Sequence, residues 1–282
     1  MNIYEAAEKP DNGKLVYHNI EEEVRASDKL VYDSFKEEIL SLQKSRTYTE
    51  DRAYFVQLNL LGNRIRRESR KHELALLEEF GYVLVEDGAD TGSPRSVPSD
   101  LTYTSEVTQY NASSSSYRYT VDWSFPYQDG LWDTYDVAGV GMTNTTDYIF
   151  YTTFGKTFNS IGAESCYVDE YGNSSGYAPN AMTKSSETAS DVAFNVADVL
   201  DFTDYFVSAH GRITVYIHKT APASQTKTNR FVAAYEHNNK TLSWLAQAVI
   251  KGLSFSNAEL QVTYKTVNNR WKRASGGKTI TW

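Results

Sequence analysis

The stretch that most constrains the fold is Tyr117–Phe125, YRYTVDWSF, in which large apolar and polar residues alternate without a break. Successive side chains of a β-strand point to opposite faces of its sheet. The stretch therefore predicts a strand with one aromatic face on a core and one face in water. A charged region with helical periodicity precedes it, and a Ser/Thr- and Tyr-rich region follows it. We expect the architecture to change at this strand.

Two helices are predicted before this strand. In residues 21–44 the apolar positions recur at intervals of three, four and seven, which is the spacing of one helix face. The same spacing holds in residues 49–80, where Thr49 is a suitable N-cap and Gly81 a suitable stop. Residues 1–19 show no period and are expected to be an irregular lead. Together the two helices form a predicted helical hairpin.

Short strands separated by turn sequences are predicted after residue 117. They are expected within residues 135–141, 148–154, 165–171, 213–217, 231–235, 260–264 and 280–282. Residues 212–236 are interpreted as an antiparallel pair with a long connection, and residues 176–190 as a loop. Residues 241–253 fit the helical and the strand period, so both interpretations stay open.

The predicted fold class is α+β, with an N-terminal helical hairpin followed by an antiparallel β-sandwich, jelly-roll or Ig-like, of roughly eight to ten strands. We divide the chain into a helical hairpin region at 1–87, a Ser/Pro/Gly-rich linker at 88–116 and an antiparallel β-sandwich domain at 117–282. The division rests on DGADTGSPRSVPSD, whose Pro, Gly and small polar residues are typical of chain that runs over a surface.

Charge and composition exclude several classes of partner. The formal net charge of −8 argues against a general affinity for nucleic acid or anionic membrane. No long apolar run occurs, so no membrane-spanning helix is expected. The first residues lack a basic start followed by an apolar run, so no signal peptide is recognised in the sequence. The single cysteine, Cys166, allows no internal disulfide and is expected to be a buried bystander.

Few residues are arranged for catalysis or metal binding. The G-x-S-x-G signature of a serine nucleophile does not occur. His210 and His237 would come together if residues 212–236 formed a hairpin, which makes them candidate metal ligands. The aspartates of ADVLDFTDYF and QDGLWDTYD do not match the spacing of a calcium loop, and solubility is their favoured explanation. The sequence therefore leans against an enzyme and predicts no cofactor.

The second predicted helix contains a strongly basic run, RIRRESRKHE. It holds Arg64, Arg66, Arg67, Arg70 and Lys71. The favoured interpretation is a solvated helix face balanced by Glu68 and Glu73. The alternative is a face that binds an anion or a partner.

Three aromatic residues in or beside a predicted turn are the candidate ligand-binding residues: Tyr127, Trp132 and Tyr135. Aromatic side chains on loops stack against sugars or anchor partners. A lid that closes one end of the sandwich is the favoured alternative for the same three residues.

The motifs YRYTVDWSF, WDTYDVAGVGMT, CYVDEYGNSSGY and NNRWKRASGG, taken in order, resemble those of uncharacterised β-rich extracellular proteins of Gram-positive bacteria. In that group a charged helical lead precedes a Ser/Thr/Tyr-rich β domain. The resemblance covers the β-rich part of the chain. It implies an extracellular or cell-surface location. It implies no particular activity, because none is assigned to that group.

Three functional hypotheses follow. The leading one is a non-enzymatic secreted or surface-exposed binding or structural protein with a protein or glycan partner. Its helical hairpin would serve as a stalk, a pro-segment or a homo-oligomerisation element. The second is a carbohydrate-binding module or glycoside hydrolase. The third is a pore-forming toxin, in which alternating segments such as TNTTDYIFYTTFGKTF become barrel strands.

Overall fold

A computed structural model gives the fold of the 282-residue chain. The residues that it describes are 10–45, 52–85, 102–110, 115–124, 134–159, 161, 164–198, 210–222, 224–238, 250–256, 259–264, 270–274 and 278–281.

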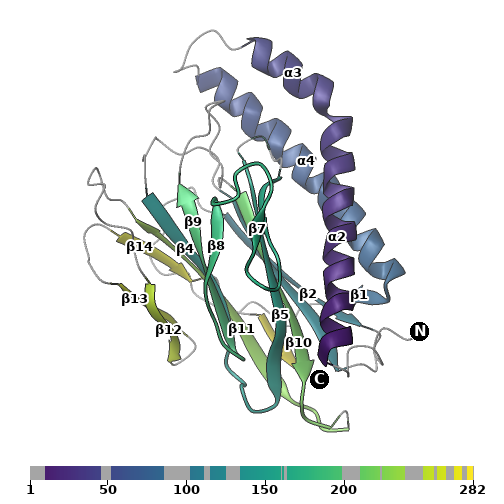
Figure 1. Cartoon of the computed structure of the whole chain (residues 1–282), viewed down its shortest axis with the longest axis vertical. Coiled ribbons are helices and arrows are strands. Elements are labelled where there is room, and N and C mark those ends of the chain that lie inside the picture. Colours follow the sequence, from purple (N-terminus) through teal and green to yellow (C-terminus); the bar gives the residue numbers. More distant parts are fainter. Residues whose placement is uncertain are drawn as a thin grey trace.

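The described chain begins with three helices (Figure 1): α2 (Pro10–Ser34), α3 (Lys36–Ser45) and α4 (Arg52–Glu79). The prediction of an irregular lead was wrong from Pro10 onwards, because a proline suits the first turn of a helix and Tyr17 and Ile20 extend the buried stripe. At Phe35 the helix is interrupted by a tighter turn, in which the Phe35 N–H donates to the Tyr32 carbonyl at 3.0 Å. The predicted helical hairpin is confirmed.

Two antiparallel sheets follow the helices. The seven-stranded sheet contains, in spatial order, β1 (Tyr82–Leu84), β2 (Thr102–Tyr110), β3 (Ser116–Ser124), β10 (His210–Lys219), β5 (Tyr148–Phe158), β6 (Glu164–Val168) and β7 (Ser174–Ser175). The six-stranded sheet contains β14 (Arg270–Ala274), β11 (Thr228–Asn238), β4 (Thr134–Met142), β9 (Asp191–Asp198) and β8 (Met182–Glu187), with β15 (Lys278–Thr281) paired to β11. A separate pair is formed by β12 (Ile250–Ser256) and β13 (Glu259–Tyr264).

The two large sheets pack face to face through aromatic side chains of β3. Tyr119 of β3 stacks on Phe231 of β11 with ring centroids 5.0 Å apart, and Trp123 lies 5.7 Å from Tyr235. Both strands keep the expected alternation on this side, so their large residues fill one common core. The predicted α+β class with a β-sandwich is confirmed. The described residues form fifteen strands, more than the eight to ten expected.

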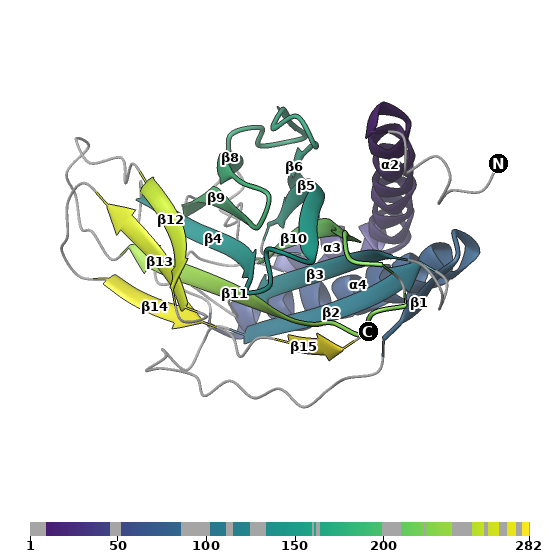
Figure 2. The same ribbon diagram turned by 90° about the horizontal axis from the view of Figure 1, so that it is seen from below.

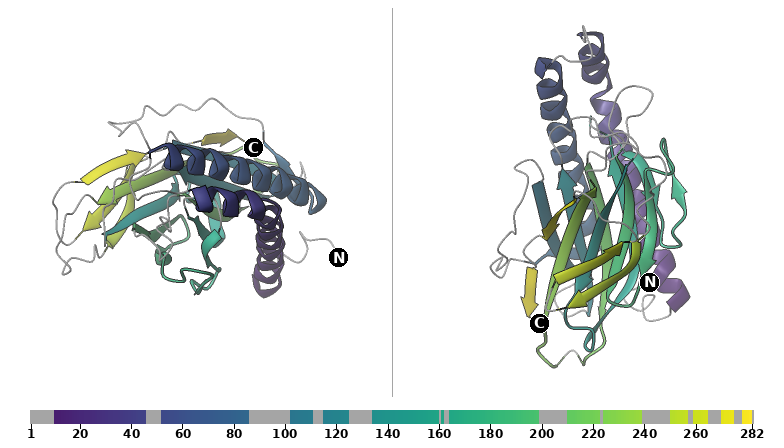
Figure 3. Two further views of the ribbon diagram at one scale, coloured as in Figure 1. Left: turned by 90° about the horizontal axis from the view of Figure 1, so that it is seen from above. Right: turned by 90° about the vertical axis from the view of Figure 1, so that its left-hand side faces the viewer.

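Helices α2 and α4 form a third layer on the outer face of the seven-stranded sheet (Figure 2 and Figure 3). The prediction that this face of β3 lies in water was wrong, because Arg118 and Thr120 are buried under α2 and α4. An apolar cluster that includes Tyr17, Leu77 and Tyr216 packs between the helices and the sheet. Helices α2 and α4 are therefore part of the folded body where they cover the sheet, whereas α3 packs against α4 beyond the end of the strands (Figure 1).

Several local predictions differ from the structure. Residues 212–236 do not pair as a hairpin, because β10 belongs to the seven-stranded sheet and β11 to the other. Residues 182–187, expected in a loop, form β8, an edge strand whose half-exposed side chains hide the alternation. Of the ambiguous residues 241–253, those from 250 onwards are strand, and the others lie outside the described residues.

Residues 102–110, which fall inside the predicted linker, form β2 and pair with β1 and β3. The strand is therefore part of the sheet, although its sequence stands between stretches of small polar residues. The division of the chain into three parts stays a prediction.

Candidate functional site

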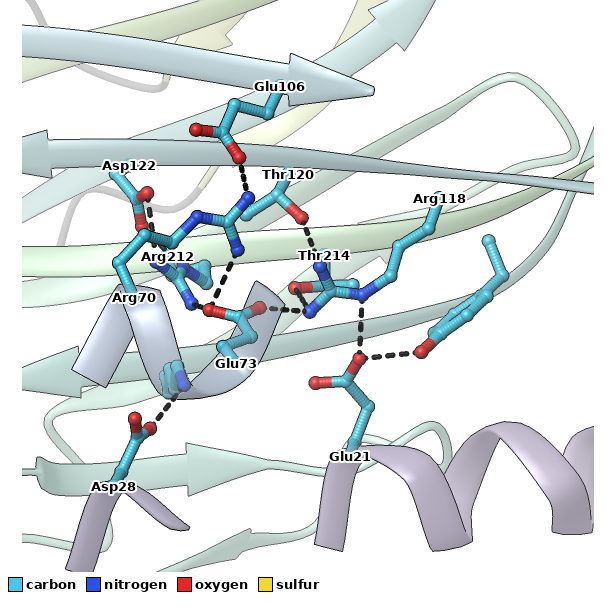
Figure 4. A network of polar contacts seen from close by, with 12 residues as sticks. Glu21, Asp28, Arg70, Glu73, Glu106, Arg118, Thr120, Asp122, Arg212 and Thr214 are labelled. Carbon is cyan, nitrogen blue, oxygen red and sulfur yellow. Dashed lines mark hydrogen bonds and ion pairs between the residues drawn. The ribbon is translucent and has the colours of Figure 1, made fainter. Parts of the chain in front are cut away.

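Glu73 of α4 is the centre of an ion-pair network between the helices and the sheet (Figure 4). Its side chain is only 1% exposed. Oε1 accepts a hydrogen bond from Arg118 Nη2 at 2.6 Å, and Oε2 accepts one from Arg212 Nη1. Arg70 Nη1 lies 2.8 Å from Oε2. One carboxylate of α4 thus contacts cations of β3, β10 and its own helix.

Arg118 of β3 links this centre to α2. Its Nε donates to Glu21 Oε1 at 3.0 Å, and its Nη1 donates to Thr120 Oγ1 at 2.8 Å. The hydroxyl of Tyr216 donates to the same Glu21 oxygen at 2.7 Å. Each of these side chains is buried, so the helix α2 is bonded to β3 and β10 in a place that solvent does not reach.

A row of charges crosses three strands of the same face. Asp122, Arg212 and Lys156 are neighbours in the register of β3, β10 and β5. Arg212 binds Asp122 in bidentate fashion, with Nε–Oδ1 and Nη2–Oδ2 distances of 2.5 and 3.0 Å. Lys156 Nζ donates to Asp28 Oδ2 of α2 at 2.5 Å. The row therefore joins the sheet to α2 through Asp28 and to α4 through the contact of Arg212 with Glu73.

The spacing of residues along α4 explains how the helix supplies these groups. Arg66, Arg70, Glu73 and Leu77 recur at intervals of four, three and four, so they lie on one face. Leu77 is buried near the C-terminal end of that face, and Glu73 lies one turn before it. The stripe that faces the sheet is therefore charged at one end and apolar at the other. The favoured interpretation of RIRRESRKHE as a solvated face was wrong for Arg70 and Glu73.

The network keeps its members charged although they are buried. Burial alone would raise the pKa of Glu73, but the nearby Arg212, Arg70 and Arg118 outweigh it and hold that pKa well below its usual value. Burial would lower the pKa of Arg118, but Glu21 and Glu73 outweigh it and raise that pKa. These groups are therefore committed to holding the layers together.

A cavity of about 760 Å³ lies next to the network, where α4 passes the ends of three strands. Ser124, His210 and Phe158 are register neighbours at that end of β3, β10 and β5, and all three line the cavity. Five arginines and two aspartates also line it, which gives the wall an excess of positive charge. The size is typical of a small-molecule site.

Two of the five arginines differ from the others. Arg64 is paired with Glu38, Arg70 with Glu73 and Glu106, and Arg212 with Asp122 and Glu73. Arg66 and Arg67 have no ion pair with any carboxylate of the described residues. Burial lowers the pKa of Arg66 to about 10, and Asp122 offsets only part of that effect. The cavity therefore carries cations that the network does not neutralise.

The strand side of the cavity has a close backbone approach at Gly211. A Cβ built on Gly211 would lie 1.9 Å from Cζ2 of Trp123, the register neighbour on β3. Only glycine leaves room for the indole there. Trp123 is buried and lines the cavity, so this contact fixes the shape of the strand ends.

The structure separates or leaves out the residues chosen from sequence. His210 is buried on β10 at the cavity, whereas His237 is on β11 of the other sheet. Of the three aromatic candidates, Tyr127 and Trp132 lie outside the described residues, and Tyr135 is in β4 with an undescribed side chain. Both sets stay predictions.

Other expectations concern single residues. Cys166 is fully buried, as expected, and burial raises the pKa of its thiol. Within the described residues, no three His, Cys, Asp or Glu side chains come together as a metal site would require. None of the described helices combines the length and the apolar character needed to cross a bilayer.

Sequence reasoning identified the basic run but not the cavity beside it. The available signal was the presence of charged residues inside otherwise apolar helix stripes. Glu21 and Asp28 are spaced with Tyr17, Val24 and Val31 along α2, and a charge in such a stripe indicates a buried partner.

No known protein family and no curated protein sequence matches this chain. Some solved structures are similar to parts of it. A structure described as a pore forming protein has 7% sequence identity and a TM-score of 0.34, over 64% of this chain and 87% of that one. The T6 backbone pilin of Streptococcus pyogenes has 10% identity and a TM-score of 0.35, over 63% of this chain and 46% of the pilin.

A collagen-binding domain from a Staphylococcus aureus adhesin has 8% identity and a TM-score of 0.30, over 66% of this chain and 98% of that domain. The pilin and the adhesin come from Gram-positive bacteria. TM-scores of this size do not identify a shared function. What the chain does must be inferred from its own residues.

Proposed function

We propose that this chain is a non-enzymatic binding protein of the secreted or surface-exposed kind, and that its ligand occupies the cavity between α4 and the ends of β3, β5 and β10. The observation that carries the proposal is the cavity itself, which has the volume of a small-molecule site. Its wall is rigid, because the ion-pair network fixes α4 against the sheet. A preorganised wall lowers the entropic cost of binding.

The charged groups of the wall favour binding over catalysis. Asp28 is held by Lys156 and Asp122 by Arg212, so both aspartates of the wall are already engaged by cations. A glycoside hydrolase needs two carboxyl groups that flank a sugar bond and titrate differently. The carbohydrate-binding alternative stays compatible with the same cavity, because a binder needs no such pair.

The pore-forming alternative would require a different change. The segment TNTTDYIFYTTFGKTF contributes β5, which is hydrogen-bonded to β10 on one side and β6 on the other. Its release into a membrane would break both ladders. We therefore treat pore formation as an outcome of the test.

The test is to block the cavity and measure binding to immobilised glycans and extracellular-matrix proteins. Asn63→Trp places a large side chain at the cavity wall from an exposed position of α4. The matched control is Lys71→Trp, at an exposed position of the same helix that does not line the cavity. We expect the unsubstituted protein and K71W to bind the same immobilised ligands and N63W to lose that binding.

Two results would reject the proposal. One is equal binding by N63W and K71W, which would place the ligand elsewhere. The other is leakage from dye-loaded liposomes with no binding to either class of immobilised ligand, which would favour the pore.

A further inference from the structure

We propose that the cavity binds its ligand through a sulfate or phosphate group held by Arg66 and Arg67. This inference rests on the proposed function, since it assigns the ligand chemistry of the same cavity. It concerns the two arginines of RIRRESRKHE that the helix–sheet network leaves without a carboxylate.

The first argument is the contrast between Arg66 and the other buried cations of this interface. Arg118, Arg212 and Lys156 each contact a carboxylate within 3.0 Å. Arg66 is largely enclosed as well, yet it bonds to neutral groups, with Nη2 at 2.5 Å from Asn63 Oδ1 and 3.5 Å from Ser124 Oγ. The carboxylate that acts on Arg66, Asp122, is already bound by Arg212, and no described carboxylate forms an ion pair with Arg66. An enclosed cation that lacks its own ion pair destabilises a fold, so its presence favours an anion supplied by a ligand.

The second argument is an unused hydrogen-bond donor. Arg66 Nη1 is buried and finds no acceptor among the described residues. A guanidinium normally satisfies its donors when it is enclosed, because each unmet donor costs free energy. A ligand oxygen in the cavity would satisfy this one.

The third argument is the arrangement of donors around the space. Arg66 and Arg67 line the cavity from α4, while Ser124 and Thr104, which both carry hydroxyl groups, line it from β3 and β2. Two guanidinium groups and hydroxyls on the opposite wall suit an anion that offers three oxygens in different directions. Sulfate and phosphate esters have that geometry, whereas a carboxylate offers two oxygens in one plane.

The rest of the cavity indicates what carries the anion. Leu60 and Phe158 contribute apolar wall, and the volume of about 760 Å³ exceeds that of a single ion. A sulfated or phosphorylated sugar ring would place its charged group against the arginines and its ring against the apolar side. The inference therefore selects a small esterified ligand over an extended acidic polymer.

The probes are glucose 6-sulfate, glucose 6-phosphate, glucuronate and glucose. Binding is measured by calorimetry, and the melting temperature by thermal denaturation, with sodium chloride added to keep the ionic strength constant. We expect one or both esters to bind and to raise the melting temperature. Glucose and glucuronate should bind at least about tenfold more weakly, since each loses charge-assisted hydrogen bonds.

The variants are Arg66→Gln and Arg67→Gln, with Lys71→Gln as the control that removes the same charge from an exposed position of α4. R66Q should weaken ester binding by about tenfold or more, and K71Q should leave it unchanged. Without ligand, R66Q should melt at the same temperature as the unsubstituted protein or higher, because the variant no longer encloses a cation that forms no ion pair with any described carboxylate. A purely structural arginine would lower it.

The outcomes separate the two proposals. If no ester binds, or R66Q binds an ester as tightly as K71Q does, the anion inference is wrong. The proposed function is then tested separately by the blocking variant N63W. If glucose binds as tightly as the esters and N63W prevents it, the cavity is a site for a neutral sugar. A lower melting temperature of ligand-free R66Q would also overturn the inference.

Discussion

Substitution of Glu73 by glutamine tests whether the charged network joins the helices to the sheet. Glutamine keeps the size of the side chain but removes the negative charge that three arginines share. Breaking a buried pair by removing one partner costs about 3–5 kcal/mol. The three arginines keep a second carboxylate each, supplied by Glu21, Asp122 and Glu106. We therefore expect the lower end, a loss of about 3 kcal/mol in the free energy of unfolding.

Urea unfolding measures this loss through two probes. Circular dichroism at the helical band follows the three helices, and tryptophan fluorescence reports on the core through Trp123, among other indoles. We expect Glu73→Gln to lower the midpoint of both signals together, because the helices and the sheet share one buried interface. The control is Glu68→Gln on the same helix, whose side chain is 40% exposed and paired only with surface groups. Its midpoint should not change.

Lowering the pH is a second test of the ion pairs of Glu73. The folded-state pKa of Glu73 lies below its unfolded value of 4.5. Its contribution is therefore fully present above the unfolded pKa and is lost as the pH falls through the folded pKa. The difference in the free energy of unfolding between the unsubstituted protein and E73Q should be constant near neutral pH. It should shrink once the pH drops below the pKa of the free carboxyl group.

Two observations would refute this reasoning. A loss of less than about 1 kcal/mol would mean that the ion pairs only offset their own desolvation. A shift in the helical signal alone, with the fluorescence midpoint unchanged, would mean that the helices unfold independently of the sheet.

Three further predictions use other contacts of the same structure. Gly211→Ala places a Cβ against Trp123 and should lower the melting temperature, at an overpacking cost of about 1–3 kcal/mol; an unchanged melting curve would contradict the contact. Burial raises the pKa of Glu164 to about 7 from 4.5, so native stability should fall as the pH rises through this window. Glu164→Gln should abolish that fall and add up to about 3 kcal/mol at pH 8 by urea titration, with no gain near pH 4. Tyr216→Phe removes the donor to Glu21 and should cost about 1–3 kcal/mol by the same titration, against no loss if water replaces the hydroxyl.

The sequence was sufficient to predict helix or strand where the apolar period is unbroken, because that information is local, but it missed β2, β8 and the first turns of α2. The alternation of YRYTVDWSF identified β3 and the side of it that meets the second sheet. Strand pairing is different. The connection after Lys219 has the composition of a hairpin loop, yet the chain crosses there from one sheet to the other. A turn sequence states that the chain reverses and does not state which strand it will pair with.

The burial of Arg118 could not be predicted from its own neighbourhood. A polar residue that alternates with aromatic ones normally faces water. Here its partners Glu21 and Glu73 come from positions 97 and 45 residues away along the chain. Complementarity over such distances is a property of the folded chain. It was visible only indirectly, as carboxylates inside the apolar stripes of α2 and α4.

The same network explains why the cavity stands out. At the interface between the helices and the sheet, the buried cations of the network are matched by carboxylates that the chain itself provides. Arg66 follows the same helix stripe as Arg70, one turn further towards the strand ends, but no described carboxylate forms an ion pair with it, since the nearby Asp122 is bound by Arg212. Because the chain neutralises the other buried arginines of this interface, leaving Arg66 without an ion pair at the cavity wall adds nothing to the stability of the fold. The exception is best explained by a charge that arrives from outside.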